Sequence, residues 1–277
     1  MQMGQMDLFE EIARLRKAGI KAALATIVNV RGSIPSFESA KLLVREDGSL
    51  FGTVGGGCVE AEVWTAARKV IEEEKPRKLT FSLNNDPSYD TGLLCGGTLE
   101  IFVEPILPIP YVYIFGAGHV SLSLSKVATL AGFRSVIIDD RDSYANRERF
   151  PEAAEIYAED YATAFARLEP NSSSFLIAVT RGHRDDMLVL RWAVSTPARY
   201  IGMIGSKRKV IEIVDYLAEK EAVPRSQLER VHAPIGLEIG AITPEEIAVS
   251  VVAEMIAVRR NALAESNVKP KSILAVS

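Results

Sequence analysis

Apolar residues recur with helical spacing at the start of this chain and form shorter, strand-like runs after it. Leu8, Ile12 and Leu15 lie on one helical face, and Gly19 follows as a stop signal, so we expect a helix over residues 8–18. The apolar runs beyond it are short and bounded by turn residues, a pattern typical of strands. The chain is therefore predicted to mix helices and strands.

The first hundred residues predict a small sheet with one further helix. Residues 41–45 and 50–54 flank the turn Glu46-Asp47-Gly48-Ser49 and form an expected hairpin. The other expected elements are strands over 22–30, 78–83 and 98–104 and a helix over 58–74, which Pro76 ends.

The periodicity changes after residues 105–110, which hold three prolines and are interpreted as a linker. Strands and helices alternate beyond it, which predicts a parallel sheet with right-handed crossovers. The expected strands are 111–115, 135–138, 175–179 and 200–204, and the expected helices include 121–132 and 244–260. Thr243 and Pro244 suit the N-cap and first position of the last helix, and the tail from Asn261 is expected to be frayed.

These patterns predict an α/β fold in two domains. An N-terminal α/β domain is expected over residues 1–105, and a C-terminal Rossmann-like domain with a parallel sheet over residues 111–277, joined by the linker 105–110.

Composition narrows the classes of function. The 277 residues are 48% apolar and 25% charged, as in soluble globular proteins. A net charge of −4, with nothing that resembles a basic stripe, argues against a nucleic-acid partner. No apolar run is long enough to cross a bilayer, and the first residues show no secretory signal, so we expect a cytoplasmic protein with no membrane partner.

A glycine-rich loop, Gly116-Ala117-Gly118-His119-Val120-Ser121, follows an expected strand and opens an expected helix. In dinucleotide-binding folds the first glycine allows the tight turn and the second lets a pyrophosphate approach. Ser121 replaces the third glycine, so the contact between helix and strand must accommodate a hydroxymethyl group. Asp139 and Asp140 end the next strand about 20 residues on, where an acid can bind ribose hydroxyls. The candidate nucleotide-binding residues are Gly116, Gly118, His119, Asp139 and Asp140; alternatively, the scaffold uses its glycines for packing and binds another ligand.

Two later strand ends lead to the same expected cleft. Ser206 and Lys207 stand at an expected helix start, where a phosphate is favoured, although residues 207–209 can equally form a solvated helix face. His119 and His183 are candidates for acid–base catalysis or metal ligation across the cleft; alternatively, each donates one hydrogen bond within a loop.

Both cysteines of the chain lie beside glycines, Cys58 after Gly55-Gly56-Gly57 and Cys95 before Gly96-Gly97. Cys58 also stands at an expected helix start, where free N–H groups favour a thiolate. The two thiols are candidates for sulfur, metal or cofactor chemistry, and the alternative is two small buried residues in tight turns. Two thiols without nearby histidines do not make a closed zinc site.

Taken in order, the motifs closely resemble those of the xanthine dehydrogenase accessory factor (XdhC/CoxI) family. They are Arg31-Gly32-Ser33-Ile34-Pro35, Gly55-Gly56-Gly57-Cys58-Val59-Glu60, Cys95-Gly96-Gly97, Gly116-Ala117-Gly118-His119-Val120, Asp139-Asp140-Arg141, Thr180-Arg181-Gly182-His183, Gly202-Met203-Ile204-Gly205-Ser206 and Pro234-Ile235-Gly236-Leu237. The resemblance implies an N-terminal accessory domain and a C-terminal Rossmann-like domain.

The resemblance also implies a function. Such a protein binds molybdenum cofactor, supports its sulfuration and delivers it to a xanthine dehydrogenase-type molybdenum hydroxylase, without being a hydroxylase itself. The implied partners are the molybdenum hydroxylase apo-enzyme and a cysteine desulfurase, and we expect a homodimer.

The resemblance implies contacts for the cofactor as well. Its phosphate would lie at Gly55-Gly56-Gly57 or at the Gly116 loop, and the thiolates of Cys58 and Cys95 would lie near the metal. Arg31 would clamp a phosphate or a pterin carbonyl.

Two other functions compete with this one. In an NAD(P)-dependent oxidoreductase, Asp139 or Asp140 would hold the adenosine ribose and His119 or His183 would donate a proton. The third hypothesis is an interaction protein whose fold has lost its ligand.

Overall fold

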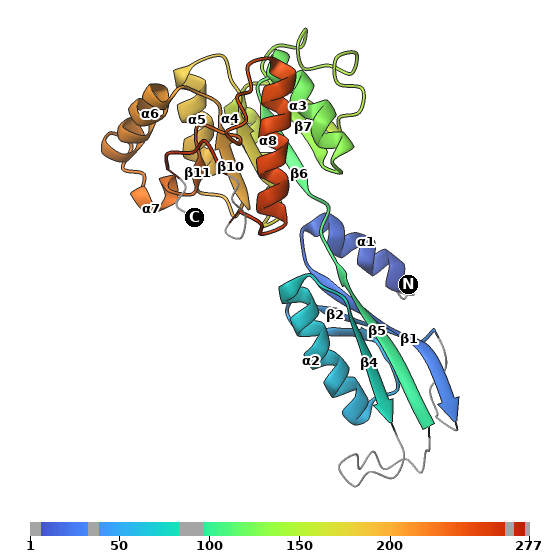
Figure 1. Ribbon diagram of the computed structural model, residues 1–277. Coiled ribbons are helices and arrows are strands. Elements are labelled where there is room, and N and C mark those ends of the chain that lie inside the picture. The colour runs from blue at the N-terminus through green and yellow to red at the C-terminus, as the bar shows by residue number, and fades with distance from the viewer. Residues whose placement is uncertain (1–6, 33–38, 83–96, 264–268, 275–277) are drawn as a thin grey trace. The chain divides into compact units, whose positions relative to one another are not determined.

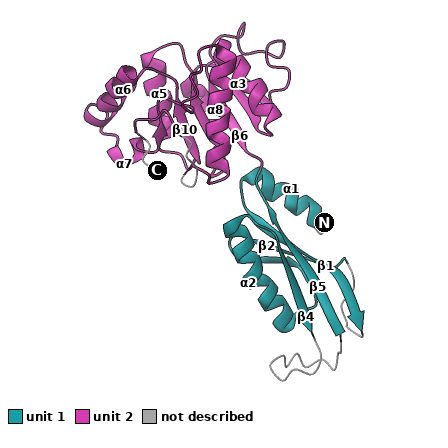
Figure 2. Cartoon of the chain, in the orientation of Figure 1, with its two compact units in different colours: residues 1–108 teal, residues 109–277 magenta. Residues whose placement is uncertain are grey.

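The computed structural model describes residues 7–32, 39–82, 97–263 and 269–274. The chain forms two compact units, residues 1–108 and 109–277 (Figures 1 and 2). Each unit has its own sheet and its own hydrophobic core.

The N-terminal unit is built on an antiparallel sheet with the strand order β3-β2-β1-β5-β4. Its elements are α1 (Leu8–Ala18), β1 (Ala22–Gly32), β2 (Lys41–Arg45), β3 (Leu50–Gly52), α2 (Gly57–Glu73), β4 (Arg77–Ser82) and β5 (Gly97–Ile106). Side chains of β1 alternate between the sheet's two faces. Ala23 and Ala25 pack in a cluster with α2, while Ala22 and Leu24 pack in a cluster with α1. The two helices therefore cover opposite faces (Figure 1).

The predicted end of the first helix is confirmed. Gly19 caps α1 in the left-handed conformation at φ 77°, which favours glycine. The hairpin of β2 and β3 is also confirmed, with Leu43 opposite Phe51.

The linker prediction is wrong at its first two residues, because β5 runs through Pro105 to Ile106. Ala23 pairs with Pro105 on the β1 side of the strand, whereas the ladder with β4 begins only at Val103. The missing N–H of Pro105 can thus face the edge that β4 leaves uncovered, which is where a strand tolerates proline.

The C-terminal unit contains a six-stranded sheet with the order β11-β10-β9-β6-β7-β8, and every neighbouring pair is parallel. Its strands are β6 (Tyr111–Phe115), β7 (Arg134–Ile138), β8 (Glu155–Tyr157), β9 (Phe175–Ala178), β10 (Tyr200–Met203) and β11 (Val231–His232). Its helices are α3 (His119–Leu130), α4 (Tyr161–Phe165), α5 (His183–Ala193), α6 (Lys207–Glu219), α7 (Arg225–Leu228) and α8 (Pro244–Arg259). The predicted α/β fold with a Rossmann-like parallel sheet is confirmed.

Two layers of helices cover this sheet (Figure 1). Val112 and Ile114 of β6 point into a core shared with α3 and α8. Tyr113 and Phe115 point to the other face, into a core shared with α4, α5 and α6. The helices after β6 and β9 therefore lie on opposite faces.

The tail is more ordered than expected. Residues 269–274 return to the sheet, where the N–H groups of Lys271 and Ile273 donate to the carbonyls of Gly236 (2.8 Å) and Ala233 (2.9 Å). The expectation of a frayed tail is wrong for this segment.

Candidate functional site: the crevice between β6 and β9

The order of the strands places a crevice at the carboxyl ends of β6 and β9. Counted along the chain within this unit, the order is 6-5-4-1-2-3, the arrangement found in dinucleotide-binding folds. Because α3 and α5 leave these two neighbouring strands toward opposite faces, the crevice between them is where open parallel sheets bind ligands.

Glycines cap both helices that begin at the crevice. Gly118 is the N-cap of α3 and Gly182 the N-cap of α5, with φ of −73° and −167°, and neither helix has a side-chain cap among the described residues. An added Cβ would meet no atom within 4 Å at either position. Neither backbone angle requires glycine, so the structure itself gives no steric reason for these two glycines.

Gly116 is a glycine for a different reason. Its φ is +109°, and an added Cβ would overlap the carbonyl oxygen of Val179. This glycine lets the turn after β6 pass close to the end of β9. The tight turn thus explains Gly116, whereas contact of a ligand with Gly118 stays a prediction.

The acid at the end of β7 is occupied within the protein. Asp139 is completely buried, and its carboxylate accepts hydrogen bonds from the N–H of Ala117 (2.7 Å) and from the Arg141 guanidinium (2.8 Å). Burial alone would raise the pKa of Asp139, but these hydrogen bonds more than offset it and hold the pKa below its usual range. This geometry favours Asp140, which is exposed, as the candidate for ribose contact.

Asp140 is in turn paired across the sheet. The Arg181 guanidinium donates to its two carboxylate oxygens at 2.7 and 2.8 Å. Asp140 follows β7 and Arg181 follows β9, and β6 lies between those strands.

Ser206 and Lys207 begin α6, as predicted. The Ser206 side chain accepts a hydrogen bond from the Lys209 N–H at 3.3 Å, so it already serves as the N-cap. Lys207 and Arg208 are exposed, which agrees with a solvated helix face.

His119 and His183 are the first residues of α3 and α5. Both side chains are exposed and sit on the helices that flank the crevice. Catalysis by either stays a prediction.

Two polar clusters were missed by sequence reasoning. Buried Asp186 accepts a hydrogen bond from Thr180 (2.7 Å) and an ion pair from Lys209, which ties the start of α5 to α6. The motif around Thr180 signalled a loop but not this buried pair.

The second cluster lies on α8. Buried Glu254 accepts hydrogen bonds from the Tyr200 hydroxyl (2.5 Å) and the Gly236 N–H (2.7 Å), and its other oxygen lies 2.9 Å from His232 Nδ1. Burial, and then the Glu254 charge, raise the pKa of Tyr200 well above its usual range. A charged residue between Val251 and Met255 on the apolar face of this helix was the available signal.

In the N-terminal unit, Cys58 is the second residue of α2 and is exposed, so it is not a small buried residue in a turn. Gly55, Gly56 and Gly57 before it have φ of 117°, 77° and 65°, angles that favour glycine. The run thus has a conformational reason of its own. An added Cβ at Gly56 or Gly57 would meet nothing within 4 Å, which also leaves open space beside the thiol.

Arg31, near the end of β1, is exposed. Cys95 lies outside the described residues, and so do Ser33, Ile34 and Pro35. Within the described ranges, no three His, Cys, Asp or Glu side chains gather as a metal site requires. None of the described helices is long and apolar enough to cross a membrane.

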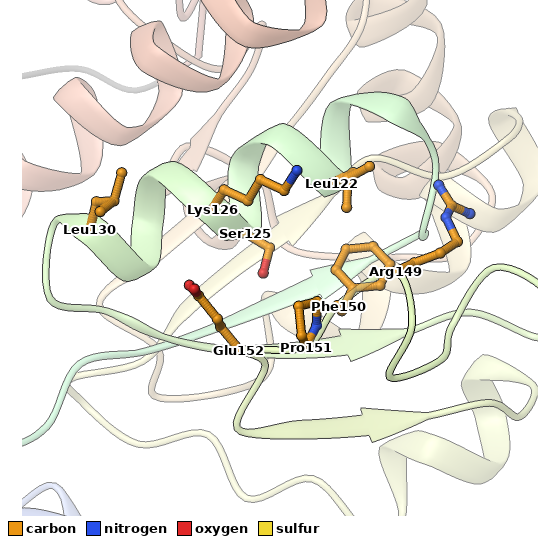
Figure 3. A pocket seen from close by; sticks show the side chains of 8 residues that line it. All are labelled: Leu122, Ser125, Lys126, Leu130, Arg149, Phe150, Pro151 and Glu152. Atoms are coloured by element: carbon orange, nitrogen blue, oxygen red, sulfur yellow. The ribbon is translucent and has the colours of Figure 1, made fainter.

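A separate hollow of ≈ 270 Å³ lies on the flank of α3 (Figure 3). It is lined by Leu122, Ser125, Lys126, Leu130, Arg149, Phe150, Pro151 and Glu152. None of these residues belongs to the glycine loop or to the Arg181–Asp140 pair, so the hollow is distinct from the crevice.

The fold and the crevice define a two-unit α/β protein with a Rossmann-type second unit. The model of the XdhC Rossmann domain matches residues 112–255, and the model of the XdhC and CoxI family matches residues 15–82. The chain therefore belongs to the XdhC and CoxI family, as its motifs predicted.

Three relatives extend this comparison. The chain is 35% identical over 266 residues to the uncharacterized protein YqeB of Escherichia coli K12, which covers 96% of this chain but 48% of YqeB. This chain thus spans about half the length of that relative. It is 24% identical to a probable xanthine dehydrogenase subunit of Bacillus subtilis 168, over 87% of this chain and 94% of that one. It is 25% identical to the molybdenum cofactor insertion chaperone PaoD of Escherichia coli K12, over 92% of this chain and 89% of PaoD.

Among solved structures, the crystal structure of a xanthine dehydrogenase from Bacillus halodurans matches 95% of this chain and 98% of its own, with a TM-score of 0.50 and 24% identity. This likeness shows the same fold.

Proposed function

We propose that this protein is a maturation factor that binds molybdenum cofactor, supports its sulfuration and inserts it into a xanthine dehydrogenase-type molybdenum hydroxylase. The observation that carries the proposal is the match, over 92% of this chain, to a protein named as a molybdenum cofactor insertion chaperone. The proposed partners are the apo-hydroxylase and a cysteine desulfurase.

The crevice of the C-terminal unit supports the binding of a phosphate. Molybdenum cofactor is an anionic, sulfur-rich pterin phosphate, so its carrier needs hydrogen-bond donors and space for a phosphate. Gly118 and Gly182 leave that space at two helix N-termini, where N–H groups and the helix dipole favour an anion. Ser206 and Lys207 also belong to the proposed site, because they follow β10, the strand next to β9.

In the N-terminal unit, Cys58 supports the binding of a metal centre. The cofactor contributes a soft metal centre, for which a thiolate is a suitable ligand. Cys58 is exposed in the first turn of the 17-residue helix α2. Arg31, Cys95 and the Gly55-Gly56-Gly57 run complete the proposed contacts of this unit.

Cofactor retention tests the proposal. The full chain is purified from cells that make molybdenum cofactor, passed through gel filtration and assayed for bound pterin by fluorescence. We expect wild-type protein to retain pterin and Cys58→Ser to lose most of it at unchanged thermal stability. The matched control is Thr65→Ser on the same helix, which should retain pterin. Light scattering in the same run measures the proposed homodimer.

Each outcome has a separate meaning. Wild-type protein that retains no pterin contradicts the proposed function. Pterin retained equally by wild type and Cys58→Ser removes only Cys58 from the site.

One observation favours a second candidate, an NAD(P)-dependent oxidoreductase: the strand order and glycine loop are those of dinucleotide-binding folds. Against it, Asp139 is buried in internal hydrogen bonds, and Asp140 is paired with Arg181. Titration with NADH, followed by its fluorescence, tests this candidate. Tight binding with turnover of a carbonyl substrate would favour the enzyme over the carrier.

A further inference from the structure

The Arg181–Asp140 ion pair spans the glycine-loop crevice. The two residues follow β9 and β7, which are separated by β6, so their carboxyl ends lie roughly 10 Å apart, two strand spacings. A bond between the two side chains at 2.7 and 2.8 Å must therefore cross the end of β6, where Gly116 and Gly118 begin the loop. A ligand that enters between β6 and β9 meets this pair.

Arg181 can exchange its partner Asp140 for a phosphate at little cost in stability. Arg181 and Asp140 are 49% and 42% exposed, and ion pairs with this much solvent contact contribute little to stability. A phosphate carries more charge than a carboxylate and matches the fork of an arginine as well. Asp139 and Asp186 do not compete for Arg181, because they are buried and paired with Arg141 and Lys209.

A second donor lies at the carboxyl end of β6, where the Tyr161 ring packs edge-on against that of Phe115, the last residue of the strand, with 6.1 Å between the ring centroids. The Tyr161 side chain is only 5% exposed, and its hydroxyl has no hydrogen-bond partner among the described residues. Burial, and then the charges of Asp139, Asp185 and Asp140, raise the pKa of Tyr161, while Arg181 acts in the opposite direction. Because its pKa is raised, the Tyr161 hydroxyl keeps its proton and is available as a neutral hydrogen-bond donor.

A buried donor without an acceptor is unfavourable, and native structures rarely leave one unpaired. Tyr161 begins α4, which follows β8, the strand beside β7. In the order of the strands that these residues follow, Asp140 therefore lies between Tyr161 and Arg181.

We propose that Arg181 is a phosphate-binding residue held in reserve by Asp140, and that a phosphate-bearing ligand displaces Asp140 and accepts hydrogen bonds from Arg181 and Tyr161. Asp140 is then the latch of the site, because its carboxylate repels the entering anion until Arg181 changes partner. The inference rests on the proposed anion-binding role of the crevice and adds the residues that control entry.

Calorimetric titration of the full chain with inorganic pyrophosphate tests this assignment at fixed ionic strength. Asp140→Asn should bind pyrophosphate several-fold more tightly than wild type, because it removes the competing charge. Arg181→Ala and Tyr161→Phe should bind about tenfold more weakly, since each removes a hydrogen bond to a charged group. Arg181→Lys keeps the charge without the fork and should fall between wild type and Arg181→Ala.

Arg191→Ala is the matched control. Arg191 forms a similarly exposed ion pair with Glu221 at the other end of α5, so it loses the same charge far from the crevice. Its affinity for pyrophosphate should equal that of wild type.

The test of the latch is that Asp140→Asn and Arg181→Ala change the affinity for pyrophosphate in opposite directions. Equal affinity of Arg181→Ala and wild type, weaker binding by Asp140→Asn, or no binding by either wild type or Asp140→Asn would overturn the latch. Arg181-dependent pyrophosphate binding by a protein that retains no pterin would leave the latch standing and remove the proposed function. Pterin retention by a protein whose pyrophosphate binding does not depend on Arg181 would leave the proposed function standing and remove the latch.

Discussion

The carboxylate of Asp139 accepts a 2.7 Å hydrogen bond from the backbone N–H of Ala117, at the centre of the glycine loop. The same carboxylate holds Arg141, which stacks on the Tyr144 ring with its guanidinium carbon 3.8 Å from the ring centroid. Asp139, which the sequence offered as a ribose-binding acid, therefore stabilises the glycine loop through the Ala117 N–H.

The first prediction concerns this acid. Asp139→Asn should lower the stability of the C-terminal unit by about 1–3 kcal/mol, because the buried charged acceptor of the hydrogen bonds from Ala117 and Arg141 is lost. Denaturant unfolding followed by the fluorescence of Trp192, in a Trp64→Phe background, measures it. Asp140→Asn is the neighbouring control and should cost less than about 1 kcal/mol, because its ion pair is exposed. Equal costs for the two variants would contradict the structural role of Asp139.

The two glycines of the loop should respond in opposite ways to the same substitution. Gly116→Ala should destabilise the protein by more than about 2 kcal/mol, because the new Cβ is strained at φ +109° and overlaps the Val179 carbonyl. Gly118→Ala should cost less than about 1 kcal/mol, because the backbone angle is ordinary and the space is open.

Binding completes this comparison. The methyl group of Gly118→Ala fills the space that we assign to a phosphate, so pyrophosphate affinity should fall about tenfold or more while the fold persists. Thermal unfolding and calorimetric titration of both variants measure the two effects. A Gly118→Ala protein that binds as well as wild type would show that the open space is unused.

Two serines on α3 give a third prediction. Ser121 is completely buried, and its hydroxyl makes no hydrogen bond with any described residue, whereas the hydroxyl of buried Ser125 bonds that of Ser135 at 2.8 Å. Ser121→Ala should stabilise the protein by about 1 kcal/mol, and Ser125→Ala should destabilise it by about 1–3 kcal/mol by leaving Ser135 unpaired. Denaturant unfolding of the two variants measures the difference, and the same sign for both would contradict it.

Local signals in the sequence predicted most of the elements. Gly19 ended α1 as expected, and Thr243 caps α8 in a capping box with Glu246. These signals act within a few residues of the chain, so they can be read without knowing the fold. The edge strands β8 and β11 have three and two residues, too short for a periodic pattern, and neither was predicted.

The chemistry of the site was less accessible to sequence. The roles of Asp139 and Asp140 depend on which carboxylate turns toward Ala117 and which toward Arg181, 41 residues away along the chain. The pair of Tyr200 and Glu254 joins residues 54 positions apart. Such partners are set by the order of strands in the sheet, which spacing along the chain does not reveal.

The last prediction is a pH dependence in the N-terminal unit. Glu11 is 2% exposed and accepts hydrogen bonds from Arg14 and Arg45 at 2.7 Å each. The hydrogen bond from Arg14 is the largest cause that lowers the pKa of Glu11. Burial raises this pKa, but together with the hydrogen bond from Arg45 the net result is a pKa lowered from 4.5 to about 2. Between these values the unfolded chain binds more protons than the folded one. The stability that Glu11 contributes is therefore complete above about pH 4.5 and is lost as the pH falls toward 2.

Glu11→Gln isolates this contribution. We expect the variant to be less stable than wild type by about 1 kcal/mol or more at neutral pH, because two charged donors lose their charged acceptor. Unfolding followed by Trp64 fluorescence, in a Trp192→Phe background, reports on the N-terminal unit. The gap between the two proteins should narrow steadily below pH 4.5, because protonation removes from wild type what the substitution has already removed. A gap that stays constant down to the lowest pH at which the unit folds would mean that Glu11 contributes through packing rather than through its charge.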